Sequence, residues 1–282
     1  MSKIVSIQSV VPCTGIQYCD LRPVIEADSI DEYREMLAEV GRLAGNDAFV
    51  QRMEKNRKGK EKICTDDGCL YFDKAAHTYE DEDGNIFQSG SVWAGQFEKP
   101  FDAQAIAPKV AEKRLTTPEQ VVAGWDMKGE VSCDYGTAVH KALECAIKYG
   151  EMPNNPHLNA LCQDYIDMSH DEDQVSEQFV ADFDHKLCGV IDVLVNKGDK
   201  HVIIRDFKTS DIYKKITLTP RAKELWPELQ SKLISIYQLQ LSFYAYILAN
   251  RGYCVESLEI YAESAEAWQV VKLPVLDIKE AL

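Results

Sequence analysis

The fold is decided by GVIDVLV, residues 189–195, and by HVIIRDFK, residues 201–208. The first stretch is apolar on both of its alternating faces, which is typical of a strand that is covered on both sides of a sheet. The second stretch is rich in β-branched and aromatic residues, so we expect a second strand there. Between them, residues 196–199 contain Asn, Gly and Asp and predict a turn. The two stretches therefore predict a β-hairpin.

Charged side chains interrupt both predicted strands. Asp192 is the one charge in the first strand, and the alternation of the second strand places Asp206 and Lys208 on the same face. A hairpin through the turn would bring Asp192 beside that pair. A charge in a core must be paired, bound to a metal or functional to be tolerated. The hairpin thus predicts a site with two carboxylates and one ammonium group.

This set of charges is typical of a site for a hard divalent cation. Mg²⁺ takes one or two protein carboxylates and uses substrate phosphate to complete its coordination. We expect Asp192 and Asp206 to be ligands, with the backbone carbonyl of Phe207 as a third oxygen. Lys208 would orient the attacking water or stabilise the pentacovalent phosphorane. The alternative is an ordinary Asp/Lys ion pair on an exposed edge strand, which the apolar flanks disfavour.

Three motifs in this region resemble those of a known nuclease family. They are Gly-x-x-Asp at residues 189–192, Asp-x-Lys-Thr-Ser at residues 206–210, and Gln-x-x-x-Tyr at residues 240–244. Together they resemble the PD-(D/E)XK nuclease superfamily, specifically its RecB-like, phage-type exonuclease branch. The stretch from residue 70 to residue 250 is similar to the mitochondrial genome maintenance exonuclease family. The resemblance implies an enzyme that cuts DNA, often from ends, with Mg²⁺ or Mn²⁺.

The same branch usually carries Gly-Thr-x-x-His on an upstream helix, and this motif occurs at residues 136–140. An apolar stripe predicts a helix between Ser132 and Tyr149; it consists of Val139, Leu143, Ala146 and Ile147. His140 and Glu144 lie one turn apart on its flank. The resemblance implies that His140 is a metal ligand, although a histidine beside a core stripe is more often structural. For Glu144, three roles stay open: metal ligand, partner that orients His140, and solvated charge.

Glu177 is a further candidate ligand. It lies in VSEQFVADF, residues 175–183, where strand alternation places it on the same face as Val175, Phe179 and Phe183. From an adjacent strand it could face the metal. A charge at the end of a strand is the equally open alternative.

The segment from Lys232 to Asn250 is apolar nearly all round, which predicts a buried helix. Buried amides and phenols need hydrogen-bond partners, so the polar residues of this helix are informative. Gln240 and Tyr244 are one turn apart and match Gln-x-x-x-Tyr, and the resemblance implies that they contact the active-site loop or a DNA phosphate. Gln238, which also has a tyrosine nearby, is the competing position.

These segments predict an α/β fold with a central mixed β-sheet flanked by helices and an N-terminal extension. Its core would be the restriction-endonuclease-like core that the PD-(D/E)XK resemblance implies. Late strands are expected at residues 256–262 and 268–273, and earlier helices at residues 103–114 and 118–128.

The same breaks predict the domain organisation. We expect a nuclease domain at residues 66–282, in which residues 66–130 wall the substrate channel and residues 131–282 form the catalytic core. Residues 1–65 would be an accessory lobe or arm, with a helix at residues 31–43.

A net charge of −15 argues against DNA binding by a wholly basic surface, but it is compatible with a local basic track. One dense cluster of cations consists of Arg52, Lys55, Arg57, Lys58, Lys60 and Lys62. A second set surrounds the predicted site and consists of Lys197, Lys200, Arg205, Lys214 and Lys215. Either set could hold phosphates. The first is equally typical of a solvated linker.

Nine cysteines without a regular framework are typical of reduced thiols in the cytoplasm, where we place the protein. The sequence has no apolar run as long as a membrane span and no long apolar signal region, so no membrane partner is expected. The cysteine pairs at residues 13 and 19 and at residues 64 and 69 are spaced too loosely to favour zinc. An iron–sulfur cluster, which some relatives bind, is not expected, because only Cys254 follows Cys188.

The function expected from these features is metal-dependent hydrolysis of DNA, by an exonuclease in recombination, replication or repair. Its partners would be linear duplex or single-stranded DNA ends and a recombination or replication protein, and oligomers are compatible with this role. One alternative is a structure-specific (flap) endonuclease with the same site, because chemistry and strand polarity depend on different parts of a chain. Another is a non-catalytic DNA-binding subunit that retains the nuclease fold, which the intact Asp192, Asp206 and Lys208 disfavour.

Overall fold

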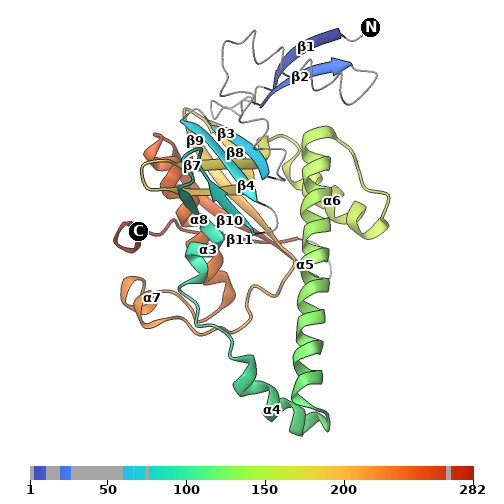
Figure 1. Ribbon diagram of the computed structural model, residues 1–282, viewed down its shortest axis with the longest axis vertical. Helices are drawn as coiled ribbons and strands as arrows, with labels where there is room; N and C mark the ends of the chain where they lie inside the picture. Colours follow the sequence, from blue (N-terminus) through green and yellow to red (C-terminus); the bar gives the residue numbers. More distant parts are fainter. Residues whose placement is uncertain (1–2, 11–19, 27–59, 66, 74–75, 265–267) are drawn as a thin grey trace. The chain divides into compact units, whose positions relative to one another are not determined.

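The computed structural model describes residues 3–10, 20–26, 60–65, 67–73, 76–264 and 268–282, the first two ranges by their backbone alone (Figure 1). The chain divides into two compact units. The N-terminal unit comprises Met1–Ser89 and Phe179–Cys188, and the core unit comprises Gly90–Gln178 and Gly189–Leu282. The predicted helix at residues 31–43, the cations at residues 52–58 and the cysteines at residues 13 and 19 lie outside the described residues.

The N-terminal unit is built mainly from antiparallel strands. β1 (Lys3–Val10) pairs with β2 (Asp20–Glu26). An antiparallel meander follows, formed in sequence order by β3 (Lys60–Thr65), β4 (Gly68–Asp73), β5 (Thr78–Glu80) and β6 (Ile86–Ser89). Asp81 fixes the turn after β5, because its carboxylate accepts hydrogen bonds from the N–H groups of Asp83 and Asn85 at 2.9 and 2.8 Å.

Cys64 and Cys69 face each other across the β3–β4 hairpin and form a disulfide. The expectation that all nine cysteines are reduced thiols is therefore wrong for this pair. The reason lies in the strand register, because directly opposed residues of an antiparallel pair bring their side chains within bonding reach. The predicted domain boundary between residues 65 and 66 falls inside this hairpin.

The core unit is built on a mixed sheet. β8 (Leu187–Gly198), which begins in the N-terminal unit, forms the predicted antiparallel hairpin with β9 (His201–Lys208). β9 pairs in parallel with β10 (Cys254–Glu263), and β10 pairs antiparallel with β11 (Trp268–Leu273). β7 (Asp173–Asp182) also pairs with β8. Left-handed backbone conformations at Gly198, Asp199 and Lys200, with φ of 86°, 49° and 61°, close the β8–β9 turn.

Helices cover both faces of this sheet (Figure 1). α5 (Pro118–Tyr149) and α6 (Pro156–Ser169) pack on one face, where Val139 and Tyr165 meet Phe207 and Trp268 in a buried cluster. α8 (Leu233–Asn250) packs against β9 and β10 and contacts α3 (Gly90–Gly95). The unit also contains α7 (Pro220–Leu225) and the 3-10 helix η1 (Lys279–Ala281). The predicted α/β class, a mixed sheet flanked by helices, is confirmed. Across the described ranges, no helix has both the length and the apolar composition that a membrane span requires.

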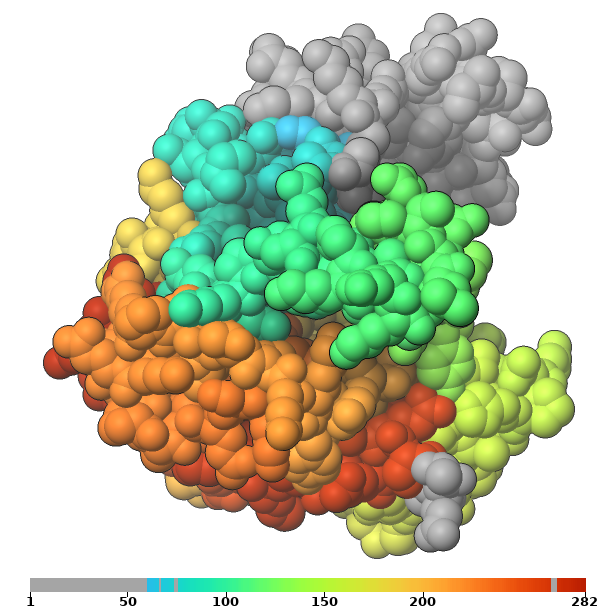
Figure 2. All heavy atoms as spheres, turned by 90° about the horizontal axis from the view of Figure 1, so that it is seen from below, coloured from blue at the N-terminus to red at the C-terminus, as the bar shows by residue number. Residues whose placement is uncertain are grey.

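α4 (Ala103–Arg114) packs against α5 and forms a helical hairpin with its first half, which Figure 2 shows from below as a green surface. The sequence predicts two helices where α5 is continuous, so the expected break after residue 128 is wrong. α5 begins at a capping box of Thr117 and Gln120 and ends at Gly150, whose φ is 67°. Gly124 and Gly129 only weaken the helix, because glycine keeps the backbone N–H that proline lacks. The boundary expected after residue 130 therefore lies inside one helix.

Candidate metal centre

The β8–β9 hairpin brings the two predicted carboxylates together. Val193 pairs with Arg205, and this register places Asp192 opposite Asp206. Oδ2 of Asp192 accepts a hydrogen bond from the backbone N–H of Phe207 at 2.8 Å. Asp206 is buried, with 3% of its surface exposed. Phe207 thus contributes its N–H to the site, and the role of its carbonyl oxygen as a ligand stays a prediction.

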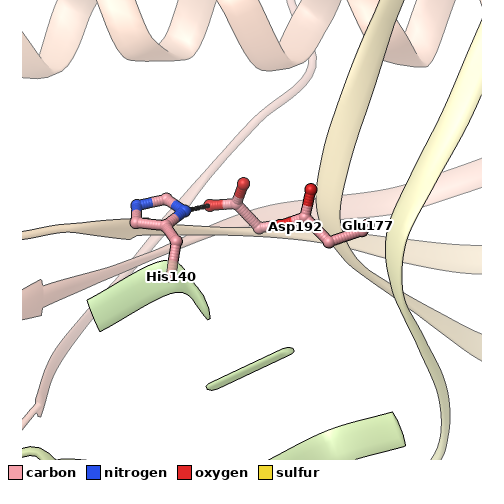
Figure 3. A group of neighbouring side chains, drawn as sticks. All are labelled: His140, Glu177 and Asp192. Atoms are coloured by element: carbon pink, nitrogen blue, oxygen red, sulfur yellow. Dashed lines mark ion pairs between the residues drawn. The ribbon is translucent and has the colours of Figure 1, made fainter. Parts of the chain in front are cut away.

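His140 reaches this site from α5 (Figure 3). Its Nδ1 atom lies 3.4 Å from Oδ2 of Asp192. Gly136, on the same helix, lies beside the end of β9, because a Cβ atom there would be in ordinary contact with Oγ1 of Thr209, at 3.4 Å. The Gly-Thr-x-x-His motif thus begins beside the Asp-x-Lys-Thr-Ser motif and ends at the imidazole that faces Asp192.

Glu177 completes a group of three side chains with metal-binding chemistry (Figure 3). One ligand atom from each of Glu177, His140 and Asp192 lies within 4.8 Å of the other two. Glu177 is on β7 and has a φ of 53°, a left-handed conformation that a non-glycine residue rarely adopts. Such positions persist where the surrounding structure imposes them, often at functional sites. Of the two interpretations from the sequence, this placement matches the one in which Glu177 faces the site from an adjacent strand.

Lys208 is held between a carboxylate and an aromatic ring. Its Nζ atom lies 2.5 Å from Oδ2 of Asp206 and 4.6 Å from the centre of the Tyr237 ring on α8. The Tyr237 hydroxyl lies 3.0 Å from Oγ of Ser210, the last residue of the Asp-x-Lys-Thr-Ser motif. Tyr237 is not among the site residues predicted from the sequence. Its position three residues before Gln240, one turn away on the same helix, is the signal that could have indicated it.

Burial and neighbouring charges shift the pKa values of these groups. Burial lowers the pKa of His140, but the Asp192 carboxylate raises it by more, to about 9. Burial raises the pKa of Asp192, and the imidazole and Lys208 bring it below its ordinary value. Burial and the charge of Asp192 raise the pKa of Glu177 to about 7. Burial also raises the pKa of Asp206, against the opposing effect of Lys208. The carboxylates therefore repel one another, and a divalent cation would relieve that repulsion.

Glu144 is engaged by two lysines on its own helix. Its carboxylate oxygens lie 2.7 Å from Nζ of Lys141 and 2.9 Å from Nζ of Lys148. Burial raises the pKa of Glu144, and these two ammonium groups bring it below its ordinary value. Within the described part of the chain, the group of metal-ligand atoms does not include Glu144. Of its three predicted roles, the charge outside the metal site comes nearest to these contacts, but Glu144 is ion-paired rather than solvated.

Arg205 cannot hold a phosphate in this structure, so its assignment to the basic set is wrong. It is 5% exposed, its Nε donates to Glu259 at 2.8 Å, and its Nη2 donates to Glu172 at 3.0 Å. Strand alternation explains the correction, because Arg205 points to the opposite face of β9 from Asp206, toward Tyr165 of α6. The guanidinium of Arg205 therefore pairs with the carboxylates of Glu172 and Glu259 on the face of the sheet that α6 covers.

Some of the other predicted cations already have a polar partner in the described part of the chain. Nζ of Lys197 lies 3.7 Å from a carboxylate oxygen of Glu172, and Nζ of Lys200 donates to a backbone carbonyl at 3.4 Å. From the first cluster, Lys60 lies 2.6 Å from Glu80. Lys214 and Lys215 are exposed on the segment that follows β9 and stay the stronger candidates for phosphate contact.

The Gln-x-x-x-Tyr motif packs against the Gly-x-x-Asp motif. A Cβ atom on Gly189 would lie 2.3 Å from Cε1 of Tyr244, so the tyrosine ring occupies the space that a side chain on β8 would need. Tyr244 is 3% exposed, and its hydroxyl accepts a hydrogen bond from Nε2 of Gln240 at 3.1 Å. The expectation that Tyr244 contacts DNA does not fit this burial, whereas Gln240 is half-buried and stays a predicted contact. The competing Gln238 donates to the carbonyl of Pro274 at 2.9 Å.

Gly189→Ala is expected to lower the free energy of unfolding by roughly 1–3 kcal/mol, because the new methyl group would overlap a buried ring. Chemical denaturation of the full chain measures this change. Gly95→Ala is the matched control, since a Cβ atom at that position meets nothing within 4 Å. It should change the stability by less than about 0.5 kcal/mol. Equal effects of the two substitutions would contradict the packing of Tyr244 on β8.

Comparisons with known proteins identify no family for this chain. No protein-family model matches it, and no curated protein matches it either. Among solved structures, one described as "Crystal structure of SSO0001" is similar over 69% of this chain and 69% of its own, with 13% sequence identity and a TM-score of 0.30. A likeness at that TM-score supports no conclusion about the fold or the activity of this chain.

Proposed function

We propose that this chain is a metal-dependent deoxyribonuclease with a PD-(D/E)XK core, acting as an exonuclease in DNA recombination, replication or repair. The meeting of Asp192, Asp206 and Lys208 on adjacent strands carries the proposal, with the imidazole of His140 3.4 Å from Asp192. Motifs that are far apart in sequence also contact one another, through Gly136 beside Thr209 and through Gly189 beside Tyr244. A structural ion pair alone would not require this combination.

The donor set fits a divalent cation. Ligand atoms that share an octahedral Mg²⁺ lie up to roughly 4 Å apart. The three candidate ligand atoms lie within 4.8 Å of one another, so a small adjustment would close them around an ion. Carboxylates suit Mg²⁺ and Mn²⁺, and one imidazole among them favours a transition metal such as Mn²⁺. When bound, the cation would polarise the phosphate and lower the pKa of a water molecule.

Each residue of the site has a separate proposed task. His140, Asp192 and Glu177 would hold the cation. Asp206, which is not in that group among the described residues, would position Lys208 and is proposed as a further ligand. The ammonium group would stabilise the negative charge that develops on the phosphate. Hydrolysis joins the oxygen of water to phosphorus and breaks one P–O bond to a sugar, whose oxygen leaves and takes up a proton. The partly exposed imidazole and Lys208 are the polar groups that would face the substrate.

His140→Ala is expected to weaken Mn²⁺ binding by roughly 10–100-fold, because it removes one of three ligand atoms. Isothermal titration of Mn²⁺ into the folded, full-length protein measures this without any DNA. The matched control is His170→Ala, since His170 is an exposed histidine that is ion-paired with its neighbour Asp171. Binding that is unchanged in both variants would rule out His140 as a ligand. A loss that is equal in both variants would have a cause outside the site.

A further inference from the structure

A cavity of about 450 Å³ lies in the helical hairpin of α4 and α5. It is lined by Arg114 at the end of α4, by Thr116 in the turn, and by residues of the first turns of α5. Those α5 residues include Gln120, Gly124, Trp125 and Lys128. One face of α5 forms this wall of the cavity, because positions 121, 124, 125 and 128 are three or four residues apart. Its volume is within the range of ligand-binding pockets.

The charged residues that line this cavity are both cations. Within the described part of the chain, neither Arg114 nor Lys128 has a carboxylate partner, although the chain carries a net charge of −15. The Oε1 atom of Gln120 accepts hydrogen bonds from Thr116 and from the backbone N–H of Thr117. The group that Gln120 can offer to a ligand is therefore its amide NH₂, a hydrogen-bond donor. Two unpaired cations and an amide donor are the chemistry that binds a phosphate.

Trp125 supplies an aromatic surface beside these donors. It is half-buried, lines the cavity, and is held edge to face by Phe101 at a ring-centroid distance of 5.2 Å. Trp125 also packs against the small apolar cluster of Ala107, Ala111 and Val121 between the two helices. An aromatic ring beside cations is the arrangement on which single-stranded nucleic acids stack their bases.

We propose that this cavity binds one nucleotide of a single DNA strand. The phosphate lies between Arg114 and Lys128, and the base stacks on Trp125. The choice of DNA rests on the proposed nuclease function, whereas the binding itself requires neither the metal nor hydrolysis. The hairpin then holds a DNA strand at a distance from the metal centre. This gives a role to the region that is predicted to wall the substrate channel.

Gly124→Glu tests this site without removing any contact of the fold. A Cβ atom at position 124 meets nothing within 4 Å, so the substitution places a carboxylate at the cavity and raises the helix propensity of α5. Gly129→Glu is the matched control, because it is on the same helix, has equally open space and changes the net charge equally, but does not line the cavity. Lys128→Gln is the second variant and should lower the salt slope of binding by about one.

Binding is measured on the full chain by fluorescence anisotropy in EDTA, with a labelled oligothymidylate of about 12 nucleotides. The Kd values of the two glutamate variants are compared at one fixed salt concentration, and the salt slopes of the wild type and Lys128→Gln are measured over a series of salt concentrations. Gly124→Glu is expected to raise the Kd by about tenfold or more and Gly129→Glu by less than about twofold. Equal Kd values for the two variants would overturn the site, even if the wild type cuts DNA. If an equimolar amount of free thymidine monophosphate displaces the labelled strand, the cavity is a site for free nucleotides, and the proposal that it binds a DNA strand is overturned. A selective loss in Gly124→Glu supports the site even if the wild type cuts no DNA, so the two proposals fail separately.

Discussion

Asp206→Asn is expected to reduce the rate of DNA hydrolysis about a thousandfold, which corresponds to about 4 kcal/mol of lost transition-state stabilisation. The substitution keeps the shape of the side chain and removes its charge. Asp206 is buried and lies 2.5 Å from Nζ of Lys208, so the neutral amide would neither hold the ammonium group in place nor attract a cation as the carboxylate does. Single-turnover digestion of labelled DNA with saturating Mn²⁺ measures the change.

The matched control for Asp206→Asn is Asp199→Asn, in the exposed turn that joins the same two strands. Asp199 has a φ of 49°, a conformation that asparagine also tolerates, so the control should keep full activity. Circular dichroism of both variants checks that the fold is retained. Activity of folded Asp206→Asn within about threefold of the wild type would show that the carboxylate is not part of the catalytic site.

Arg205→Leu is expected to destabilise the core unit by about 3–5 kcal/mol, the second large effect. The guanidinium of Arg205 is the cation that neutralises Glu172 and Glu259 on the α6 side of β9, and it also lies 5.3 Å from the centre of the Tyr261 ring. Its removal would leave the carboxylate of Glu259, of which 2% is exposed, with the exposed Lys272 in place of a buried cationic partner. Urea denaturation followed by circular dichroism gives the free energy of unfolding.

Lys272→Met separates this buried interaction from an ordinary surface pair. Lys272 also lies 2.8 Å from Glu259, but 70% of its side chain is exposed. Its replacement should therefore cost at most about 1 kcal/mol. If Arg205→Leu costs no more than Lys272→Met, the network around Arg205 does not stabilise the fold. If Arg205→Leu instead weakens DNA binding and leaves stability unchanged, the phosphate-binding role rejected above would be restored.

The meeting of Asp192, Asp206 and Lys208 could be predicted from the sequence because it depends on local rules. Strand alternation fixes which residues of β9 share a face, and the turn after β8 fixes the hairpin. Those two rules are enough to bring Asp192 beside Asp206 and Lys208. The same alternation, applied to Arg205, would have placed it on the opposite face. The sequence alone therefore already separates Arg205 from the cations on the Asp206 face.

The remaining parts of the site depend on tertiary structure. Glu177 reaches the group through a left-handed backbone conformation that strand patterns do not anticipate. Tyr237 meets Lys208 only because of how α8 is rotated against β9. The fit of Tyr244 against Gly189 likewise requires the helix and the strand to be placed first. The motifs indicate a set of residues, and the packing decides which of them lie in the candidate metal centre and which support those that do.

The most direct test of the proposed nuclease is the digestion of linear and closed circular DNA of the same sequence, with the linear form labelled at one end. We expect the wild type to degrade the linear DNA in Mn²⁺ or Mg²⁺, to leave the circle intact and to be inactive in EDTA. Cutting of the circle would replace the exonuclease with an endonuclease that uses the same site. A folded wild type that is inert on every DNA tested, or digestion that is equally fast in EDTA, would contradict the metal-dependent site.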